Sequence, residues 1–487
     1  MTALTRLQPS RLWTYFAQIC QIPHPSKHEH ALRQWIIQVA ESKQCRIQQD
    51  QKGNLLIRKQ ATSGHESSPT IALQAHMDMV TQANQNTKHD FFKDPIQPYI
   101  DGQWVKARGT TLGADNGIGL ASCLAILTDP SLTHGPLEIL LTVDEEAGMG
   151  GAFGLQANWL TAKHLINTDA EQDNEIFIGC AGGLEARIEI PVLKHPTAAN
   201  NQLYKIEVQG LKGGHSGLDI HKNRGNAIKI LARLLFRIKQ SISYQLTNIS
   251  GGNLRNAIPR EASTEFIVPV CNHLNLMKVF EQEISYLKKE HQISEPKLNI
   301  IISTQAVNQQ QTAFSEQITN QIINYLTLIP NGCQRMSTIM PDVVETSTNP
   351  GVLKFEQDNL ILVNFIRSLT DEGRLDVRSQ FDALAETFKF KTIFAGDYSG
   401  WAPDNSSIIT QIAQKQYQKL FGHKPKLQVI HAGLECGLFK KFYPELDMVS
   451  IGPTIENAHS PDEQVSIPSV QRYWQLLTNI LSDMTQR

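Results

Sequence analysis

The sequence predicts an α/β protein in which a mixed sheet flanked by helices is interrupted by an inserted α+β domain. From the N-terminus to residue 182, apolar strand-like runs alternate with helical runs, which is typical of an α/β layer. Between residues 183 and 396 this alternation gives way to strands followed by long polar helices, and it returns from residue 397 onwards. We therefore expect residues 1–182 and 397–487 to form one domain, with residues 183–396 as the insertion.

The first part of the chain begins with two predicted helices. Helical periodicity over Leu12–Ile22 predicts the first helix. Ser26 and Glu29 have capping-box spacing ahead of a second helix over Ala31–Ala40. The elements expected next, in chain order, are a strand at Thr70–Gln74, a helix at Gly117–Leu127, a strand at Leu137–Val143, a helix at Gly154–Leu160 and a strand at His164–Asn167.

The insertion and the last part of the chain show fewer clear elements. In the insertion we expect a strand at Tyr204–Val208, an amphipathic helix at Asn226–Lys239 and a strand at Glu261–Val270. In the last part we expect short strands at Leu427–His431 and Met448–Gly452 and a final helix at Ser469–Met484.

The composition excludes several classes of protein. Hydrophobic residues make up 41% of the 487 residues, enough for a real core, and the net charge of -2 leaves no electrostatic footprint for nucleic acid or an anionic membrane. We see no apolar span of about 20 residues and no signal peptide in Met1–Ser10. The seven cysteines are scattered and never form a CxxC pair, which suits a reducing compartment. We therefore expect a cytoplasmic protein.

Histidine and acidic residues follow several predicted strands at their ends, where sites form in open α/β sheets. His76 and Asp78 close the strand in QAHMDM, and residues two apart in an extended chain point the same way. His76 can therefore ligate a metal while Asp78 orients its imidazole. The ordinary alternative is a strand-end histidine near a solvated aspartate.

Two further motifs place carboxylates in loops. Asp115 lies in GTTLGADNGIG, where glycines allow a tight loop before a helix. In the ordinary alternative Asp115 or Asn116 is merely a helix N-cap, and in the functional one Asp115 is a carboxylate whose two oxygens bridge two cations. Glu145 and Glu146 follow a strand in VDEEAGMGG, where they are either solvated or neutralised by a metal. With a metal present, one glutamate can ligate it while the other acts as general base.

The last two candidates are Asp169 in HLINTDAEQ and His459 in GPTIENAHSPDE. Each residue is ordinary by itself and follows a predicted strand. Together with the motifs above, they supply two histidines and several carboxylates at strand ends. Such a donor set suits zinc, cobalt or manganese and lacks the thiolates of a structural zinc site.

The order of these motifs resembles the M20 family of dinuclear metallopeptidases. In chain order the motifs are HMD, GADNG, DEEAGM, NTDAE and AHSPDE. Further segments carry the resemblance, including GLKGGHSG, GGNLRNAIPRE, VVETSTN and HAGLECGLFKK. The resemblance runs from about Leu12 to Leu481, and no position expected to act departs from the family pattern.

The resemblance implies a ligand set for two divalent cations. His76, Asp115 and Asp169 would hold one metal. Asp115, Glu146 and His459 would hold the other, so that Asp115 bridges the pair. Zinc is the expected ion, with cobalt or manganese as alternatives.

The resemblance also implies roles for the neighbouring residues. Asp78 would clamp the ring of the first histidine ligand. Glu145 would be the general base that activates a metal-bridging water, and later the acid that protonates the leaving amine. The family further implies a cis peptide bond between Asp115 and Asn116.

Residues 183–396 would serve as a lid and as the interface of a homodimer. Within this insertion, His215 would bond the developing oxyanion, and Asn256 would contact the substrate. Arg367 would anchor the terminal carboxylate of a dipeptide, because its guanidinium offers two parallel donors. Glu435, in GLECG, is a candidate for lining the pocket, but the chain alone gives it no clear role.

The implied activity is hydrolysis of unblocked dipeptides with broad specificity, including Xaa-His substrates. Rivals in the same family are an N-acyl amino acid deacylase and a carboxypeptidase. The length of the insertion favours the dipeptidase, since it is roughly twice that associated with carboxypeptidase-like members. A rival from another class is a non-catalytic binding protein, which would be expected to lose Glu145 or a ligand.

Overall fold

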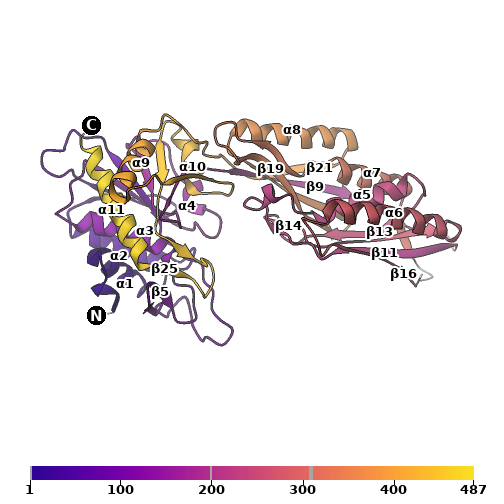
Figure 1. Cartoon of the computed structure of the whole chain (residues 1–487), viewed down its shortest axis with the longest axis horizontal. Coiled ribbons are helices and arrows are strands. Elements are labelled where there is room, and N and C mark those ends of the chain that lie inside the picture. Colours follow the sequence, from indigo (N-terminus) through magenta and orange to yellow (C-terminus); the bar gives the residue numbers. More distant parts are fainter. Residues whose placement is uncertain (1–2, 198–199, 307–310, 487) are drawn as a thin grey trace. The chain divides into compact units, whose positions relative to one another are not determined.

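The computed structural model describes residues 3–197, 200–306 and 311–486, which form two compact units. Unit 1 comprises Met1–Cys180, Trp401–Val429 and Leu434–Arg487, and unit 2 comprises Ala181–Gly400 and Ile430–Gly433. Both units combine helices with sheets, so the predicted α/β class is confirmed (Figure 1). Residues 430–433, which the sequence analysis placed with the last part of the first domain, group with unit 2.

Unit 1 is built on an eight-stranded mixed sheet with the order β1-β2-β6-β3-β7-β23-β8-β22. β3 (Ile71–His76) is buried along its whole length and pairs in parallel with β6 (Leu137–Thr142) and β7 (His164–Asn167). β7 also pairs in parallel with β23 (Asp447–Ser450). Because these four strands run the same way, their carboxyl ends meet at one edge of the sheet. The outer strands are β1 (Arg46–Gln49), β2 (Leu55–Lys59), β8 (Glu175–Cys180) and β22 (Lys426–Ile430).

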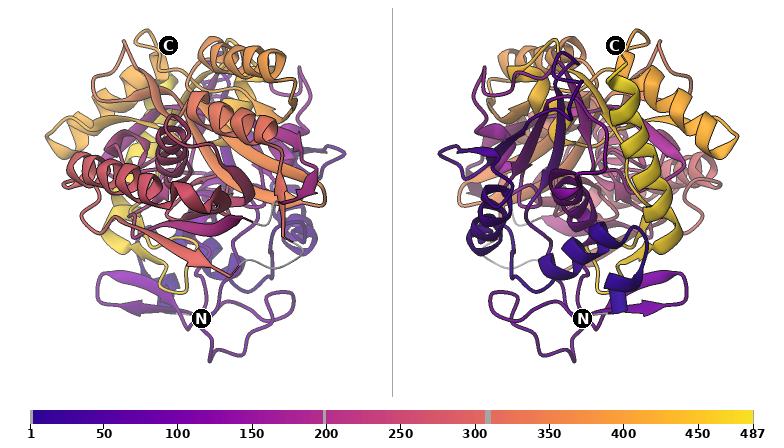
Figure 2. Two further views of the ribbon diagram at one scale, coloured as in Figure 1. Left: turned by 90° about the vertical axis from the view of Figure 1, so that its right-hand side faces the viewer. Right: turned by 90° about the vertical axis from the view of Figure 1, so that its left-hand side faces the viewer.

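Seven α-helices and a small second sheet complete the described part of unit 1. The helices are α1 (Ser10–Ile19), α2 (His30–Glu41), α3 (Ala114–Thr128), α4 (Gly150–Phe153), α9 (Ile408–Phe421), α10 (Glu435–Phe442) and α11 (Ile467–Met484). The small sheet has the order β24 (Ile455–Glu456), β25 (Gln464–Ser466), β5 (Trp104–Ala107) and β4 (Pro98–Asp101). α3 is apolar and almost wholly buried, and it packs on β3 and α1. The indigo helices α1 and α2 and the yellow α11 face the viewer in the right panel of Figure 2.

The helix predicted at Gly154–Leu160 is wrong. The only helix of this region in the described chain is α4, which ends at Phe153. Asn158 has φ 66°, a left-handed conformation that an α-helix does not accommodate. The backbone instead bonds to one side chain, because Trp159 N and Leu160 N each donate to the Tyr443 hydroxyl over 3.2 Å. A tertiary contact thus replaces the helical hydrogen bonds that the local pattern predicts.

The capping box predicted before the second helix is also wrong. α2 begins at His30, and its N-cap residue Glu29 makes no side-chain cap bond. Glu29 Oε1 instead accepts from Lys27 N and Asp144 N, both over 2.9 Å. The Ser26 hydroxyl donates to Asp78 Oδ2 over 2.8 Å. Both side chains therefore hold loops at the end of the sheet rather than the start of the helix.

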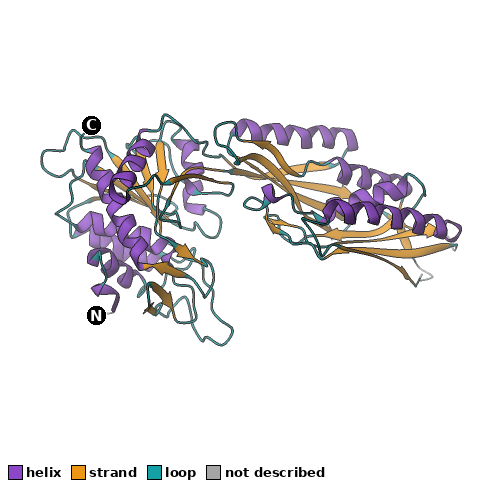
Figure 3. Cartoon of the chain, in the orientation of Figure 1, coloured by secondary structure: helices purple, strands orange, loops and turns teal. Residues whose placement is uncertain are grey.

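Unit 2 contains a nine-stranded antiparallel sheet with four helices along one face (Figure 3). The main order is β16-β11-β15-β13-β19-β20-β9-β21, and β18 pairs with β19. The strands are β9 (Gly182–Pro191), β11 (Asn201–Gln209), β13 (Gln245–Gly251), β15 (Ala262–Pro269), β16 (Asn299–Gln305), β18 (Gly332–Met336), β19 (Val344–Glu356), β20 (Asn359–Ser368) and β21 (Lys391–Tyr398). The helices are α5 (Ala227–Lys239), α6 (His273–His291), α7 (Glu316–Leu328) and α8 (Asp371–Phe388). Apolar residues from the helices and the sheet merge into one core.

Short elements at the margins of unit 2 position its polar residues. The strand pair β12 (Gly214–His215) and β14 (Ala257–Ile258) is antiparallel, as is the pair β10 (Lys194–Pro196) and β17 (Thr312–Phe314). The side chain of Asn226 caps α5 by accepting from Ile228 N and Lys229 N.

Among the helices of the described residues, none has the length and apolar character needed to cross a bilayer.

Candidate metal centre

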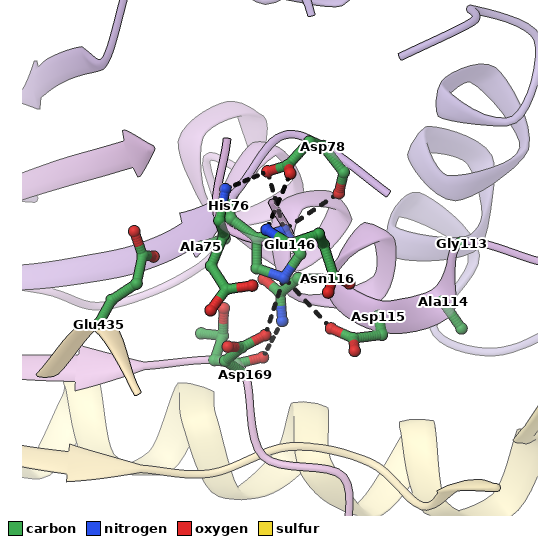
Figure 4. Close-up of polar contacts among 12 residues, drawn as sticks. Ala75, His76, Asp78, Gly113, Ala114, Asp115, Asn116, Glu146, Asp169 and Glu435 are labelled. Atoms are coloured by element: carbon green, nitrogen blue, oxygen red, sulfur yellow. Dashed lines mark hydrogen bonds and ion pairs between the residues drawn. The ribbon is translucent and has the colours of Figure 1, made fainter. Parts of the chain in front are cut away.

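His76, the last residue of β3, occupies the middle of a polar cluster in unit 1 (Figure 4). Its side chain is 1% exposed, and Nε2 lies 3.2 Å from Asp115 Oδ1 and 3.2 Å from Asp169 Oδ1. On the other side of the ring, Nδ1 lies 3.0 Å from the backbone carbonyl oxygen of Asp78. Because a carbonyl oxygen only accepts, Nδ1 carries the hydrogen and the neutral ring presents Nε2 as a free lone pair.

Asp115 places one carboxylate oxygen beside each of the two histidines. Oδ1 faces His76, and Oδ2 lies 3.2 Å from His459 Nε2. Glu146 Oε2 lies 3.1 Å from the same nitrogen of His459. The side chains therefore form two sets that share Asp115, one with His76 and Asp169 and the other with Glu146 and His459.

The geometry of these sets fits divalent cations. Two donor atoms held at about 2.0–2.2 Å from one ion in a tetrahedral arrangement lie roughly 3.3–3.6 Å apart, close to the contacts observed here. Donor atoms of His76, Asp115 and Glu146 all lie within 4.8 Å of one another. Within the described residues, Glu146 Oε1 is buried without a hydrogen-bond partner, and Asp169 Oδ1 lies 3.2 Å from His76 Nε2 without a hydrogen bond of regular geometry. Buried carboxylate oxygens need a donor or a cation, so these atoms favour a metal site.

The loop that carries Asp115 is held in place where it joins α3. α3 follows Gly113, which has φ 71°, and it is kinked at Asp115 and Asn116, whose backbone angles are non-helical, so the regular helix begins after them. The cis peptide bond predicted between Asp115 and Asn116 is present. Asn116 Nδ2 donates to the carbonyl oxygen of Thr168 over 2.8 Å, which ties this loop to the end of β7.

Asp78 joins the first histidine to the loop after β6. Its Oδ1 lies 3.4 Å from His76 Nδ1 and accepts from Glu145 N over 2.9 Å. Its Oδ2 accepts from Glu146 N over 3.0 Å. A single buried carboxylate therefore orients the ring of His76 and the backbone of the two glutamates.

Burial and like charges govern the protonation of the acidic residues. Burial raises the pKa of Glu145 well above its usual value, and the charges of Asp169 and Glu435 raise it further. Burial likewise raises the pKa of Asp169 to about 6. Hydrogen bonds to Asp115 and Glu146 raise the pKa of His459 to about 11. Protons therefore compete with any cation for this cluster.

Three acidic residues near the cluster were not assigned a role from the sequence. Glu435 is fully buried, and its Oε2 accepts from Gln74 Nε2 over 2.6 Å and from the Thr142 hydroxyl over 2.7 Å. Burial raises the pKa of Glu171 to about 8, and the charges of neighbouring acids add to the shift. Glu463 is buried and bonds to the loop of Asp115. For Glu171 and Glu463 the sequence offered one signal, an additional acidic residue close to a candidate ligand, in TDAEQD and AHSPDE.

The three predicted residues of the insertion come together within unit 2. His215 pairs with Ala257 in the β12–β14 ladder, and the carbonyl oxygen of the neighbouring Asn256 accepts from Ser216 N over 2.8 Å. Arg367 Nη2 lies 3.4 Å from His215 Nε2. Arg367 is 4% exposed, and its guanidinium lies 4.6 Å from the centroid of the Phe365 ring.

The hydrogen bonds of His215 define its tautomer. Its Nδ1 accepts from Gly217 N and Leu218 N over 3.2 and 3.0 Å, so the ring proton resides on Nε2. Burial and the positive charge of Arg367 lower the pKa of His215 to about 4. At neutral pH the ring is therefore a neutral donor through Nε2.

Two histidines and several carboxylates near the carboxyl ends of parallel strands resemble the donor sets of two-metal hydrolases. Comparison with known proteins gives the particular family. Residues 72–483 match the model of peptidase family M20/M25/M40, and the chain belongs to this family.

The relatives cover the chain over nearly its whole length. The cytosol non-specific dipeptidase of Escherichia coli K12 is 48% identical over 484 residues, 99% of both chains. The crystal structure of aminoacylhistidine dipeptidase from Vibrio alginolyticus superimposes with a TM-score of 0.94 at 46% identity, covering 99% of this chain and 98% of that one. A tripeptidase from Staphylococcus aureus shares the fold alone, with a TM-score of 0.57 at 16% identity over 99% of this chain and all of that one.

Metal binding to this cluster should weaken as the pH falls. His76 and His459 must be neutral to ligate, and the neighbouring carboxylates raise the pKa of both rings, so a cation has to displace protons at neutral pH. Below about pH 6, protonation of Asp169 should weaken binding further. Zinc titrations of the metal-free protein between pH 6 and 8 should show affinity rising with pH, by up to about tenfold per unit for each proton displaced. An affinity independent of pH over this range would contradict the histidine ligands.

Proposed function

We propose that the protein is a dinuclear metal-dependent dipeptidase that hydrolyses unblocked dipeptides with broad specificity, including Xaa-His substrates. The observation that carries the proposal is the position of Asp115, whose two oxygens each lie 3.2 Å from a different histidine. One metal would be held by His76, Asp115 and Asp169, and the other by Asp115, Glu146 and His459. The names of the two relatives that match over nearly the whole chain support the choice of dipeptides.

Peptide hydrolysis adds a hydroxyl group to the carbonyl carbon and a proton to the amine nitrogen. Bound divalent cations would lower the pKa of a water molecule and polarise the scissile carbonyl. Glu145 would take one proton from the attacking water and pass it to the leaving amine. The direction of its pKa shift suits this role, because a carboxylate with a raised pKa holds the abstracted proton more firmly until it passes to the amine. Asp78 would keep Glu145 in place through the backbone bond already described.

The polar cluster of unit 2 supplies the groups that we propose for substrate contacts. His215 would donate from Nε2 to the developing oxyanion, and Asn256 would contact the peptide. Arg367 is a buried cation for which the described residues provide no carboxylate at ion-pair distance. A buried unpaired charge is costly, so its retention favours an incoming anion as partner. The terminal carboxylate of a dipeptide is such an anion.

Zinc is the ion that we propose for the centre, with cobalt or manganese as alternatives, because nitrogen and oxygen donors of this kind accept all three.

We also propose a cytoplasmic location. All seven cysteines are free, as expected in a reducing compartment, and the similar dipeptidase of E. coli carries a cytosolic name.

The roles of the two adjacent glutamates should separate by mutation. Glu145→Gln should keep both metals but lose roughly 10²–10⁴-fold in kcat, because the amide cannot accept a proton. Glu146→Gln should lower metal content, because it removes a charged ligand beside His459. The two variants serve as controls for each other, and both are measured for metal content and dipeptide hydrolysis. A Glu145→Gln enzyme as active as the parent would exclude Glu145 as the base.

A hydrolysis panel tests the proposed activity and the role of Arg367 together. We expect the parent to cleave dipeptides and to cleave dipeptide amides, tripeptides and N-acetylated dipeptides poorly. Arg367→Ala should lower kcat/KM for dipeptides by about 10²-fold or more, the cost of removing one partner of a buried ion pair, and change cleavage of the amides little. The matched control is Arg255→Ala, an exposed arginine 5.0 Å from the same Phe365 ring.

Three outcomes of this panel would overturn the proposal. Equal cleavage of dipeptides and their amides by the parent would show that the carboxylate is not recognised. Preferential cleavage of N-acetylated substrates would favour an N-acyl amino acid deacylase instead, and release of C-terminal residues from longer peptides would favour a carboxypeptidase.

Unit 2 is also the part of the chain that we propose for homodimer formation. It carries most of the large apolar side chains exposed among the described residues, including Leu274 at 82% and Ile293 at 85%. Light scattering should therefore give about 109 kDa, twice the chain mass of 54.5 kDa. Leu274→Asp should weaken the dimer, whereas Phe92→Asp, at an exposed position of unit 1, should not. A monomer mass for the parent at micromolar concentration would contradict the proposal.

A further inference from the structure

Glu463 lies four residues after His459, and only 2% of its surface is exposed. Its carboxylate accepts from the four consecutive backbone amides of Leu112–Asp115. Oε2 accepts from the first two over 2.7 and 2.9 Å, and Oε1 accepts from the last two over 2.8 and 3.2 Å. One side chain from the loop of His459 therefore bonds to the last four amides of the loop that ends at Asp115.

The two histidines of the cluster are held in different ways. His76 belongs to the buried strand β3, and its side chain is 1% exposed, so neighbouring strands and side chains fix its ring. His459 belongs to the connection between β24 and β25, and its side chain is 53% exposed. Its backbone has φ 63°, in the left-handed region. Packing contributes little to the position of His459, so the connection itself has to be held.

The connection around Glu463 is rigid enough to transmit such a restraint. Glu463 N donates to the carbonyl oxygen of Ser460 over 3.0 Å, which closes a turn directly after His459. On the other side, β25 begins at Gln464 and pairs with both β24 and β5. The backbone between His459 and β25 is therefore short and internally bonded, and Glu463 is the point at which it meets the loop of Asp115.

We propose that Glu463 is a positioning residue that joins the loops of Asp115 and His459 into one preformed metal-binding unit. The inference rests on the proposed ligand roles of these two residues. The carboxylate is suited to the task because it is an acceptor only and can receive two amides at each oxygen. A glutamine of the same shape would turn one oxygen into a donor and direct it at two amide donors. Asp115 would then lose its fixed distance from His459.

The test compares two substitutions of buried glutamates, Glu463→Gln and Glu138→Gln. Glu138 is the matched control because it is also buried and accepts from two backbone amides, Thr161 N and Ala162 N, over 2.8 and 3.0 Å. It lies near the start of β6, at the end of that strand away from Glu146. Glu138→Gln therefore reports the general cost of neutralising a buried carboxylate in unit 1.

The readout is Co²⁺ binding to the metal-free proteins, followed by visible absorption and by competition with a chelator. We expect Glu463→Gln to lower the affinity for Co²⁺ by roughly 10–100-fold and to change the absorption bands, as loss of a ligand-orienting contact does. Glu138→Gln should keep the affinity and the bands of the parent. Thermal unfolding by circular dichroism checks that both variants are folded. If Glu463→Gln does not fold, Glu463→Asp takes its place, because it keeps the charge but is one methylene too short to reach all four amides.

The outcomes of this experiment distinguish the inference from the proposed function. Equal affinity and equal bands in the parent and the Glu463 variant would overturn the positioning role. An equal loss in the Glu138 variant would do so as well, since the effect would then be general. Failure of the parent to cleave dipeptides would overturn the proposed activity without affecting this comparison. A parent that binds no Co²⁺ would overturn the metal centre and this inference together.

Discussion

Mutual repulsion of buried carboxylates is the constraint on which the structure of unit 1 depends. Asp115, Asp169 and Glu146 surround two histidine nitrogens at contacts of 3.1–3.2 Å, with Glu145 and Glu435 close by. Such a group of like charges away from water is unfavourable unless protons or cations neutralise it. Every loop at this edge of the sheet must therefore be held against a force that would separate the acids. A bound divalent cation would relieve this repulsion.

The same chemical device holds each of these loops. Three further carboxylates accept hydrogen bonds from backbone amides of the segments that carry the candidate ligands. Asp78 accepts from Glu145 and Glu146, Glu29 accepts from Asp144, and Glu463 accepts from Leu112–Asp115. Amide donors lower the cost of burying the charge on each supporting carboxylate, while that carboxylate fixes the loop backbone. The acidic residues thus divide into a group that surrounds Nε2 of the two histidines and a group that holds the backbone.

This division explains what could be predicted from the sequence. The candidate ligands follow apolar strands, so strand ends of parallel neighbours were enough to place His76, Glu146 and Asp169 at one edge. Glu463 gives no such signal, because its partners are backbone amides about 350 positions away in the chain. Ser26 and Glu29 gave a misleading signal, since their capping-box spacing is real but their side chains bond to Asp78 and to the Lys27 and Asp144 amides instead. Local sequence patterns predict which residues lie at the ends of helices and strands. The contacts that fix loops join residues far apart in the chain, so they can be identified only once the fold is known.

The charges beside the histidines have opposite signs in the two units, and this favours different roles for these histidines. Unit 1 brings several of its own carboxylates together, and these raise the pKa of His76 and His459. Unit 2 keeps Arg367 buried next to His215, and the same proximity of a positive charge lowers the pKa of His215. At neutral pH, a histidine among carboxylates keeps its extra proton unless a cation displaces it. A histidine beside a guanidinium is neutral at the same pH and can donate a hydrogen bond. The sign of the neighbouring charge thus sets the protonation of each ring, which suits the roles proposed for His76 and His459 as ligands and for His215 as a hydrogen-bond donor.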